Sequence, residues 1–334
     1  MGEFELLAKL RERLPPAGAR VRLGSGDDAA VTVPGGATAT SVDAIVEGVH
    51  FRRGEAPMQA IGRKALAAAL SDLAAMGAEA GEAYVVLGAP PDLAEGEFEA
   101  LLDGLLALAA ETGTTLAGGD LTRSPALILA VTVVGHAPRL DDLVTRGGAR
   151  PGDLLVLSGE LGGAAAGRLL LDRPELGRGV PAIAAERLRA RQLEPTPRLG
   201  SGRALAAAGA RTMIDLSDGL AGDALHVARA GGVGLRIDAS SLPLAEGVAE
   251  VAAAAGGDPL QLAVSGGEDY ELLAALPSAR LEAAAERIAE AGETTLTEIG
   301  RVTAGEGVEL RLPGGGLLES QGYDHFRPTN RESR

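Results

Sequence analysis

Aspartate residues recur at predicted turns along this 334-residue chain, and each follows an apolar or glycine-rich segment. The four segments are GSGDDAAV with Asp27 and Asp28, TSVDAIVEGVHF with Asp43, LAGGDLTRS with Asp120, and IDLSDGL with Asp215 and Asp218. Taken singly, each segment has a structural explanation, because aspartate is common in turns and at the N-caps of helices. Taken together, aspartates on separate loops that converge on one cleft are the oxygen ligands that Mg²⁺ needs. The pattern therefore indicates either turn and cap chemistry or a divalent-metal site.

Asp72 lies inside a predicted helix, in the segment ALSDLAAMGA. It is the only charged residue between Lys64 and Glu79, so we expect most faces of this helix to be buried. An unpaired buried carboxylate is costly, and it either finds a partner or becomes neutral. Lys64 lies eight residues earlier, on about the same face of the helix, and is one candidate partner. A metal ion is the other.

Glycines accompany these acids in the segments GSGDD, AGGD and SGGED. Such glycines allow close backbone approach, so that amide N–H groups can face phosphate oxygens. The chain contains no GxxxxGK[ST] or GxGxxG motif and no protein-kinase lysine and HRD set. An acidic cleft would admit a polyphosphate only with metal ions in between. The segments therefore favour metal-bridged nucleotide chemistry at a site that is not a P-loop.

The composition excludes several classes of protein. The chain has no cysteine, which removes disulfides, cysteine-ligated zinc, iron–sulfur clusters and thiol nucleophiles. A formal net charge of −15 argues against a general nucleic-acid-binding role. The N-terminal stretch MGEFELLAKLRERL has the pattern of a charged amphipathic helix, and no window is apolar enough for a membrane span. We expect a soluble, acidic, cytoplasmic protein.

Strand and helix patterns intermix along the whole chain, which predicts an α/β (α+β) fold. Helical spacing of apolar residues marks residues 3–14, 58–76 and 97–113 in the first half and 182–192 in the second, while residues 261–276 are expected to supply strands. The polar, Gly- and Pro-rich stretch at 138–152 is the predicted linker. The predicted domains are therefore an N-terminal α/β domain at 1–137 and a C-terminal α/β domain at 153–330.

Six segments carry a family likeness. GDDAAV, VDAIVEGVHF, LSDLAAMGA, GGDLTRS, DLSDGL and GGEDYELL, in this order, resemble the thiamine-monophosphate kinase family, within the superfamily of aminoimidazole-ribonucleotide synthetase-like ATP-binding enzymes. The likeness runs from about residue 3 to Phe326. In two places the chain departs from the usual pattern: Ala69 stands for an Asn, and Leu121 stands for a Thr. Neither departure removes a carboxylate.

The resemblance implies two mixed sheet-and-helix domains with the active site in the cleft between them, and a homodimer built from strands of the N-terminal domain. It implies conversion of ATP and thiamine phosphate to ADP and thiamine diphosphate with several Mg²⁺ ions. The implied metal-site residues are Asp28, Ser41, Asp43, Asp72, Asp120, Asp215 and Asp218, of which Asp43, Asp72, Asp120 and Asp215 are the implied catalytic set. The implied nucleotide contacts are Gly119, Asp120, Arg146 and Ser217, and the implied thiamine-phosphate contacts are His50, Glu268 and Tyr323.

Several of these residues also have a purely structural reading. Arg146 either clamps a phosphate or is a solvated linker arginine. A lone histidine at a strand end, such as His50, is more often a satisfied hydrogen-bonding residue, and Glu268 either accepts from a substrate amine or caps a strand end. Tyr323, in GYDHF, is the better candidate for an aromatic face against a cationic thiazolium ring, while Tyr270 is expected to pack in the core.

The implied chemistry is consistent with the residues present. The second phosphate pKa of thiamine phosphate is about 6, so the attacking oxygen is already ionised at neutral pH and needs no general base. The reaction needs in-line positioning and neutralisation of charge between two anions, which bridging Mg²⁺ supplies. The predicted function is direct, Mg-bridged phosphoryl transfer from ATP to thiamine phosphate. The alternatives are another ATP-using enzyme of the superfamily, a non-catalytic nucleotide or thiamine-phosphate binding protein, and a metal-dependent phosphohydrolase.

Overall fold

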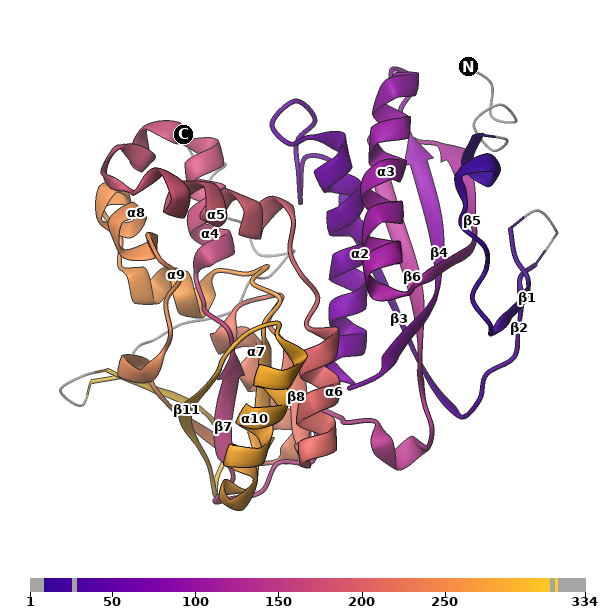
Figure 1. Ribbon diagram of the computed structural model, residues 1–334. Coiled ribbons are helices and arrows are strands. Elements are labelled where there is room, and N and C mark those ends of the chain that lie inside the picture. Colours follow the sequence, from indigo (N-terminus) through magenta and orange to yellow (C-terminus); the bar gives the residue numbers. More distant parts are fainter. Residues whose placement is uncertain (1–8, 26–28, 313–315, 318–334) are drawn as a thin grey trace.

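The structure is a computed structural model that describes residues 9–25, 29–312 and 316–317. It has two halves, each built on its own sheet, and they lie side by side with helices between them (Figure 1). The predicted mixed sheet-and-helix fold is confirmed. Among the described residues, no helix is both long and apolar enough to span a bilayer.

The N-terminal half contains a four-stranded sheet with the strand order β3-β6-β4-β5. Its elements are β3 (Ala37–Val46), β4 (Glu79–Ala89), β5 (Thr115–Arg123), β6 (Ile128–Ala137), α2 (Met58–Ala75) and α3 (Glu95–Thr112). Strand β6 pairs antiparallel with β3 and β4, and β5 pairs parallel with β4. A short hairpin of β1 (Val21–Leu23) and β2 (Val31–Thr32) lies beside β5 (Figure 1). Strands β3 and β5 are therefore the two edges of the sheet.

Helices α2 and α3 pack together on one face of this sheet (Figure 1). Two glycines let their backbones touch: a Cβ on Gly62 would lie 1.9 Å from the carbonyl oxygen of Leu101, and a Cβ on Gly104 would lie 1.7 Å from that of Gln59. The opposite face of the sheet is more open, since Val42 on β3 is 65% exposed and Val86 on β4 is 43% exposed. The sheet thus has one helix-covered face and one face that presents apolar side chains to solvent.

The C-terminal half contains a six-stranded, mostly antiparallel sheet with the order β12-β9-β11-β7-β10-β8. Its strands are β7 (Leu154–Ser158), β8 (Thr212–Asp215), β9 (Gly234–Asp238), β10 (Leu272–Leu276), β11 (Leu296–Thr303) and β12 (Gly307–Arg311). Its α-helices are α4 (Gly163–Asp172), α5 (Ala182–Leu193), α6 (Leu199–Ala208), α7 (Leu220–Gly231), α8 (Val248–Ala255), α9 (Pro259–Ser265) and α10 (Leu281–Ala291). The 3-10 helices are η1 (Leu140–Asp142), η2 (Pro174–Gly179), η3 (Ala239–Ser241) and η4 (Ser278–Arg280).

One part of the strand prediction for residues 261–276 is wrong. The stretch up to Ser265 belongs to helix α9, and only the end of the range forms a strand, β10. The helix begins there because Pro259 occupies its first position and the side chain of Asp258 accepts a hydrogen bond of 2.9 Å from the backbone N–H of Leu260. Both features are strong start signals for a helix.

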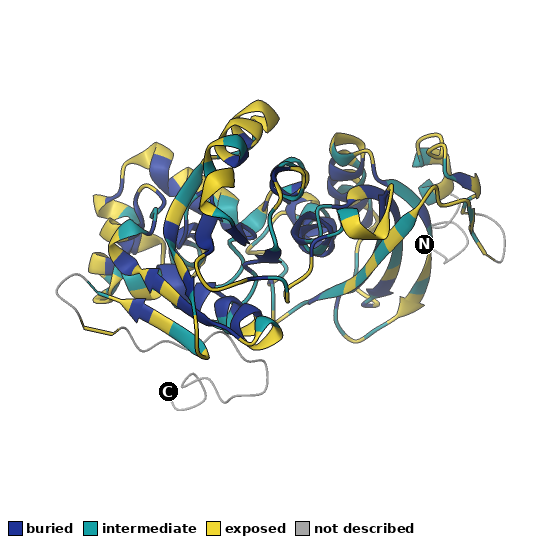
Figure 2. Ribbon diagram, turned by 90° about the horizontal axis from the view of Figure 1, so that it is seen from below, coloured by how far each residue is buried: buried dark blue, intermediate teal, exposed yellow. Residues whose placement is uncertain are grey.

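A shared apolar core joins the two halves. It includes buried residues of α2 and the four-stranded sheet together with residues of α6, β7 and β10. Gly202 on α6 lies so close to α2 that a Cβ there would be 2.0 Å from the carbonyl oxygen of Ala74. Figure 2 shows buried helices at the centre of the molecule, between the two sheets. Helix α2 is therefore the element that fixes how the halves face each other.

Candidate active site

Strand β3 and helix α2 bring three of the predicted metal-site residues together. Ser41 and Asp43 are two residues apart on β3, so their side chains share the sheet face covered by α2. The hydroxyl of Ser41 donates a hydrogen bond to the carboxylate of Asp72 on α2. The carboxylate of Asp43 accepts a bond of 2.7 Å from the backbone N–H of Ala44. The half-buried carboxylate of Asp72 thus faces other polar groups of the site.

The second half adds its acids at the end of β8. Asp215, the last residue of that strand, is only 3% exposed and accepts a hydrogen bond of 2.8 Å from Ser71, the neighbour of Asp72 on α2. In the turn that follows, the backbone N–H of Asp218 donates a 3.1 Å bond to the carboxylate of Asp223. Asp223 therefore holds the turn that carries Asp218. The acids of the two halves therefore meet at the junction, next to α2.

Burial and mutual repulsion disfavour the negative charge of these acids. Burial, followed by the charge of Asp72, raises the pKa of Asp215 to about 7. Burial also raises the pKa of Asp43, and the nearby charges of Asp72, Glu268 and Asp218 add to that rise. Nearby Arg146 acts in the opposite direction and lowers the pKa of Asp215. The chain thus supplies too little positive charge of its own to compensate the cluster.

A divalent cation fits this cluster chemically, because hard oxygen ligands with uncompensated negative charge are what Mg²⁺ binds. Asp43, Asp72, Asp215 and Asp218 are the residues that would hold it. As the side chains stand, no three His, Cys, Asp or Glu side chains within the described ranges are arranged to hold one metal ion. Instead, the hydroxyl of Ser41 donates a hydrogen bond to the carboxylate of Asp72, and the hydroxyl of Ser71 donates one to the carboxylate of Asp215.

Without a metal ion, we expect the chain to lose stability as the pH rises from about 5.5 to about 8.5. The pKa of Asp215 is raised to about 7 and that of Asp223 to about 8, both above the ordinary value of 3.8. Across this window the unfolded chain has lost these protons while the folded chain still holds them, so the free energy of unfolding falls as pH rises. We expect the melting temperature to fall by about 5 °C or more.

Mg²⁺ binds the ionised acids, so it should raise the melting temperature at about pH 8.5 far more than at about pH 5.5. Thermal melts at both pH values, with EDTA and with Mg²⁺, measure both effects. In an Asp215→Asn variant the fall with pH should shrink, because that variant lacks one of the titrating acids. An equal gain from Mg²⁺ at the two pH values would contradict the assignment.

Besides Asp215 at the end of β8, two more of the acids predicted to lie in turns are within strands. Asp43 lies within β3, and Asp120 lies within β5. Asp120 pairs in register with Val86, so it lies on the face of the sheet away from α2 and at the edge opposite β3. Within one chain, Asp120 therefore does not join Asp43 and Asp72. Asp28 and Tyr323 lie outside the described residues.

Asp120 and Gly119 line a cavity of their own, of about 490 Å³. Its other walls are mostly apolar and come from α3, β4 and the segment before β1, including Leu14, Phe98, Leu101 and Leu105. Gly119 has no room for a side chain, because a Cβ there would lie 2.1 Å from the carbonyl oxygen of Val85. This cavity has the apolar walls and the close backbone approach that suit a flat heterocycle.

A second cavity, of about 360 Å³, opens between the halves next to the acid cluster. It is lined by the predicted residues Asp43, His50, Ser217, Asp218 and Glu268, together with Tyr270. Glu268 and Tyr270 have positive φ angles of 67° and 50°, which are uncommon for residues other than glycine and cluster at functional sites. Tyr270 is buried, as expected. His50 accepts a 3.1 Å bond at Nδ1 from the backbone N–H of Val46, the satisfied state that the sequence allowed.

Lys64 pairs with Glu268 and not with Asp72. Its Nζ lies 2.8 Å from Oε1 of Glu268, across the junction between the halves. Burial opposes the charge of Glu268, yet the charge of Lys64 and a hydrogen bond from Gln192 hold the pKa of that carboxyl below its ordinary value. The sequence analysis missed Gln192 and Arg168, which also line this cavity. Neither residue lies in a recognisable motif, so only the tertiary structure reveals them.

Comparison with known proteins identifies the family. The N-terminal domain model of AIR synthase related proteins matches residues 26–137, and the corresponding C-terminal domain model matches residues 150–313. A thiamine-monophosphate kinase of Mycobacterium tuberculosis strain H37Rv is 41% identical over 283 residues, which cover 82% of this chain and 80% of that protein. The chain belongs to the thiamine-monophosphate kinase family.

Solved structures of thiamine-monophosphate kinases share the whole architecture. The enzyme of Stenotrophomonas maltophilia K279a superposes with a TM-score of 0.80 at 36% identity, covering 94% of this chain and 98% of that one. A structure of AaThiL complexed with AMPPCP and TMP superposes with a TM-score of 0.76 at 29% identity, covering 97% of each chain. The family resemblance predicted from the six sequence segments is thus confirmed.

Proposed function

We propose that this chain transfers the terminal phosphoryl group of ATP to thiamine phosphate, giving thiamine diphosphate and ADP. The observation that carries the proposal is the acid cluster at the junction of the halves, opening directly onto the cavity lined by His50 and Glu268. Membership of the thiamine-monophosphate kinase family supports the activity, and the complex of the related AaThiL with AMPPCP and TMP supports the pair of substrates.

The residues of the cluster position two anions and need no proton acceptor. The attacking phosphate oxygen of thiamine phosphate is ionised at neutral pH, since its second pKa is about 6. Asp43, Asp72, Asp215 and Asp218 are the proposed Mg²⁺ ligands, and bound Mg²⁺ would neutralise phosphate oxygens of both substrates. Arg146, whose positive charge lowers the pKa of Asp215, is the proposed contact for a phosphate of the nucleotide.

The substrates would enter from different sides of the cluster. Thiamine phosphate would occupy the cavity at His50 and Glu268, and Tyr323 stays a proposed contact outside the described residues. For the nucleotide, Ser217 and Arg146 lie near the acids, while the apolar cavity at Gly119 and Asp120 suits the adenine ring. Gly119 and Asp120 lie on β5, at the edge of the N-terminal sheet opposite β3 and its Asp43, whereas Ser217 and Arg146 lie beside the acid cluster, so one chain does not bring these contacts together.

A homodimer built on the N-terminal sheet would resolve this separation. Among the described strands, β3 and β5 are the outer strands of the sheet, and its open face exposes Val42 and Val86. Free edges and exposed apolar faces are commonly covered by a partner, and most soluble homodimers are two-fold symmetric. A two-fold arrangement that closes the sheet brings β5 of one copy to β3 of the other. Asp120 of one copy would then reach the site that holds Asp43 of the other.

The function is tested with purified protein and Mg-ATP, with and without thiamine phosphate. Formation of ADP only with the acceptor, together with thiamine diphosphate detected by chromatography, is the expected result. Release of ADP or phosphate without the acceptor would indicate a phosphohydrolase, and binding without turnover would indicate a sensor; either result would refute the proposal. A cytoplasmic location, expected from the cysteine-free sequence, is part of the same proposal.

A further inference from the structure

Helix α4 forms one wall of the cavity that opens onto the acid cluster. The residues of α4 that line this cavity are three or four positions apart and so share one face of the helix: Ala165, Arg168, Leu169 and Asp172. The opposite face packs on α5 so closely that a Cβ on Gly167 would lie 1.9 Å from the carbonyl oxygen of Leu188. The position of α4 therefore decides where its side chains lie in the cavity.

The first turn of α4 has no cap of its own. Gly162 occupies the N-cap position with a φ of 78°, and glycine has no side chain to accept a hydrogen bond from the turn. Instead, the carboxylate of Asp269 accepts a bond of 2.8 Å from the backbone N–H of Gly162 and one of 3.0 Å from that of Ala164. Asp269 lies 107 residues after Gly162 in the chain. The cap of α4 thus comes from a distant segment, the loop that also carries Glu268.

This loop is held in an uncommon backbone conformation. Glu268 and Tyr270, on either side of Asp269, have the positive φ angles described above, and such angles persist only where the surroundings fix them. The backbone N–H of Glu268 donates a 2.9 Å bond to the carbonyl oxygen of Ser217, and that of Tyr270 donates a 2.9 Å bond to the carbonyl oxygen of Leu216. These bonds tie the loop to the turn that follows β8, next to the acid cluster.

Two neighbouring carboxylates of the loop hold the two packed helices α4 and α5. Glu268 accepts a hydrogen bond from Nε2 of Gln192 on α5, and Asp269 caps α4. Burial raises the pKa of Asp269 to about 7, although the two backbone bonds and the charge of Arg191 act to lower it. Above that pKa the ionised carboxylate costs the folded chain stability. A carboxylate that is kept at such a cost indicates a role beyond stability.

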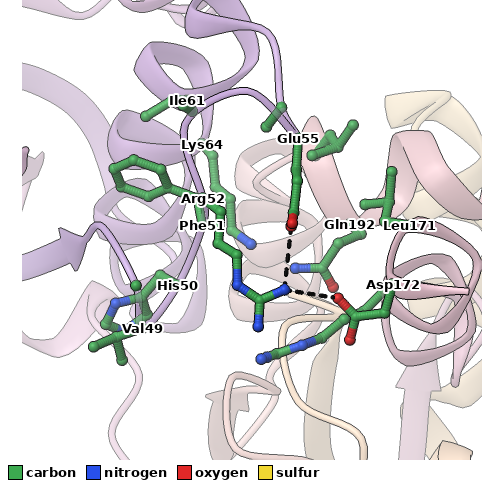
Figure 3. A pocket seen from close by; sticks show the side chains of 14 residues that line it. Val49, His50, Phe51, Arg52, Glu55, Ile61, Lys64, Leu171, Asp172 and Gln192 are labelled. Carbon is green, nitrogen blue, oxygen red and sulfur yellow. Dashed lines mark hydrogen bonds and ion pairs between the residues drawn. The ribbon is translucent and has the colours of Figure 1, made fainter. Parts of the chain in front are cut away.

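At its other end, α4 reaches the N-terminal half. Figure 3 shows Arg52, from the segment between β3 and α2, beside Asp172, the last residue of α4. A terminal guanidinium nitrogen of Arg52 lies 3.3 Å from Oδ1 of Asp172, in a solvent-exposed contact. Exposed ion pairs of this kind contribute little free energy. Of the two ends of α4, the one at Asp269 is therefore the one that is firmly held.

We infer that Asp269 is a positioning residue for the reaction, because by capping α4 from the loop of Glu268 it fixes where Arg168 lies in the substrate cavity. The inference rests on the proposed function. Arg168 is in the middle of the cavity face of α4, and its positive charge lowers the pKa of Glu268. A cation in the wall attracts an anionic substrate such as thiamine phosphate. A misplacement of about 1 Å at a site of this kind can cost about 10²-fold in rate.

The test is a double-mutant cycle between Asp269 and Arg168. Asp269→Asn keeps the shape of the side chain but offers one acceptor oxygen where two N–H groups need one each. Arg168→Met removes the charge at an exposed helix position. Each single variant should raise KM for thiamine phosphate about 10-fold and leave KM for ATP unchanged. The double variant should also show a rise of about 10-fold, and not the rise of about 100-fold that two independent effects would give.

Asp238→Asn is the matched control, because Asp238 caps a helix, η3, that does not line the cavity. This variant should change neither KM. A purely structural role of Asp269 would lower the amount of folded, active protein, and so the apparent kcat, without a change in KM. The ratio of the two parameters therefore separates positioning from general stabilisation.

The outcomes distinguish this inference from the function on which it rests. If the wild-type protein makes no thiamine diphosphate, the proposed function fails and the inference fails with it. If the wild-type protein is active, additive effects in the double variant or an unchanged KM in either single variant overturn the inference alone. Loss of the cooperative thermal melt in Asp269→Asn would make Asp269 a residue of the fold as a whole and would overturn the inference too.

Discussion

Replacing Asp43 with asparagine is expected to lower kcat by about 10²- to 10³-fold, the size of effect seen when a group that stabilises transition-state charge is removed. Asp43 lies between the two halves, and the charges of Asp72, Asp218 and Glu268 all act on it. Asparagine has the same shape and still accepts the hydrogen bond from the backbone N–H of Ala44. What it lacks is the negative charge that we assign to a metal ligand. Formation of thiamine diphosphate at saturating Mg-ATP is the measurement.

The same substitution should leave folding intact. Burial and repulsion raise the pKa of Asp43, so its ionised form costs the folded chain stability above that pKa. Without metal at about pH 8, the variant should therefore melt at the same temperature as the wild-type protein or at a higher one. Asp141→Asn, at an exposed position of η1, is the control and should change neither property. A variant of Asp43 with wild-type turnover would remove this residue from the site.

Much of the site could be predicted from the sequence because its parts are local. Asp43, Asp215 and Asp218 each lie in or next to a strong strand pattern, and strands that enter one junction bring their polar residues together. Asp72 was recognisable as the one acid in an otherwise uncharged helix. The alternation of strands and helices predicted the fold class, because apolar residues recur with a different spacing in helices than in strands.

The features that sequence could not predict depend on how distant elements meet. Lys64 shares a helix face with Asp72, but the helix packs so that its ammonium reaches Glu268 in the other half. The glycine-rich segment before Asp120 predicts a turn, yet it forms part of the edge strand β5. The strand order that separates Asp120 from Asp43 is set by tertiary pairing and leaves no local pattern. Gln192 likewise carries no signal until α5 is packed against Glu268.

The separation of Asp120 from Asp43 gives the second large prediction, which concerns two inactive chains that restore activity together. Asp43→Asn and Asp120→Asn homodimers should each lose nearly all activity. A heterodimer of the two variants contains one site that carries both substitutions and one site that carries neither, if each site takes Asp43 from one copy and Asp120 from the other. Co-expression with two different tags and sequential purification isolates that heterodimer. It should recover about half of the wild-type activity per dimer.

A reciprocal heterodimer makes this result decisive. When a wild-type chain is paired with a chain that carries both substitutions, each shared site contains one defect, so this dimer should be inactive. If instead each chain held a complete site, the two outcomes would be exchanged. The heterodimer of the two single variants would be inactive, and the heterodimer of the wild-type chain with the double variant would have about half of the wild-type activity. The strand order places Asp120 and Asp43 at opposite edges of one sheet. A single chain could satisfy the second pattern only by rearranging that sheet, whereas a two-fold dimer satisfies the first with the strands where they are.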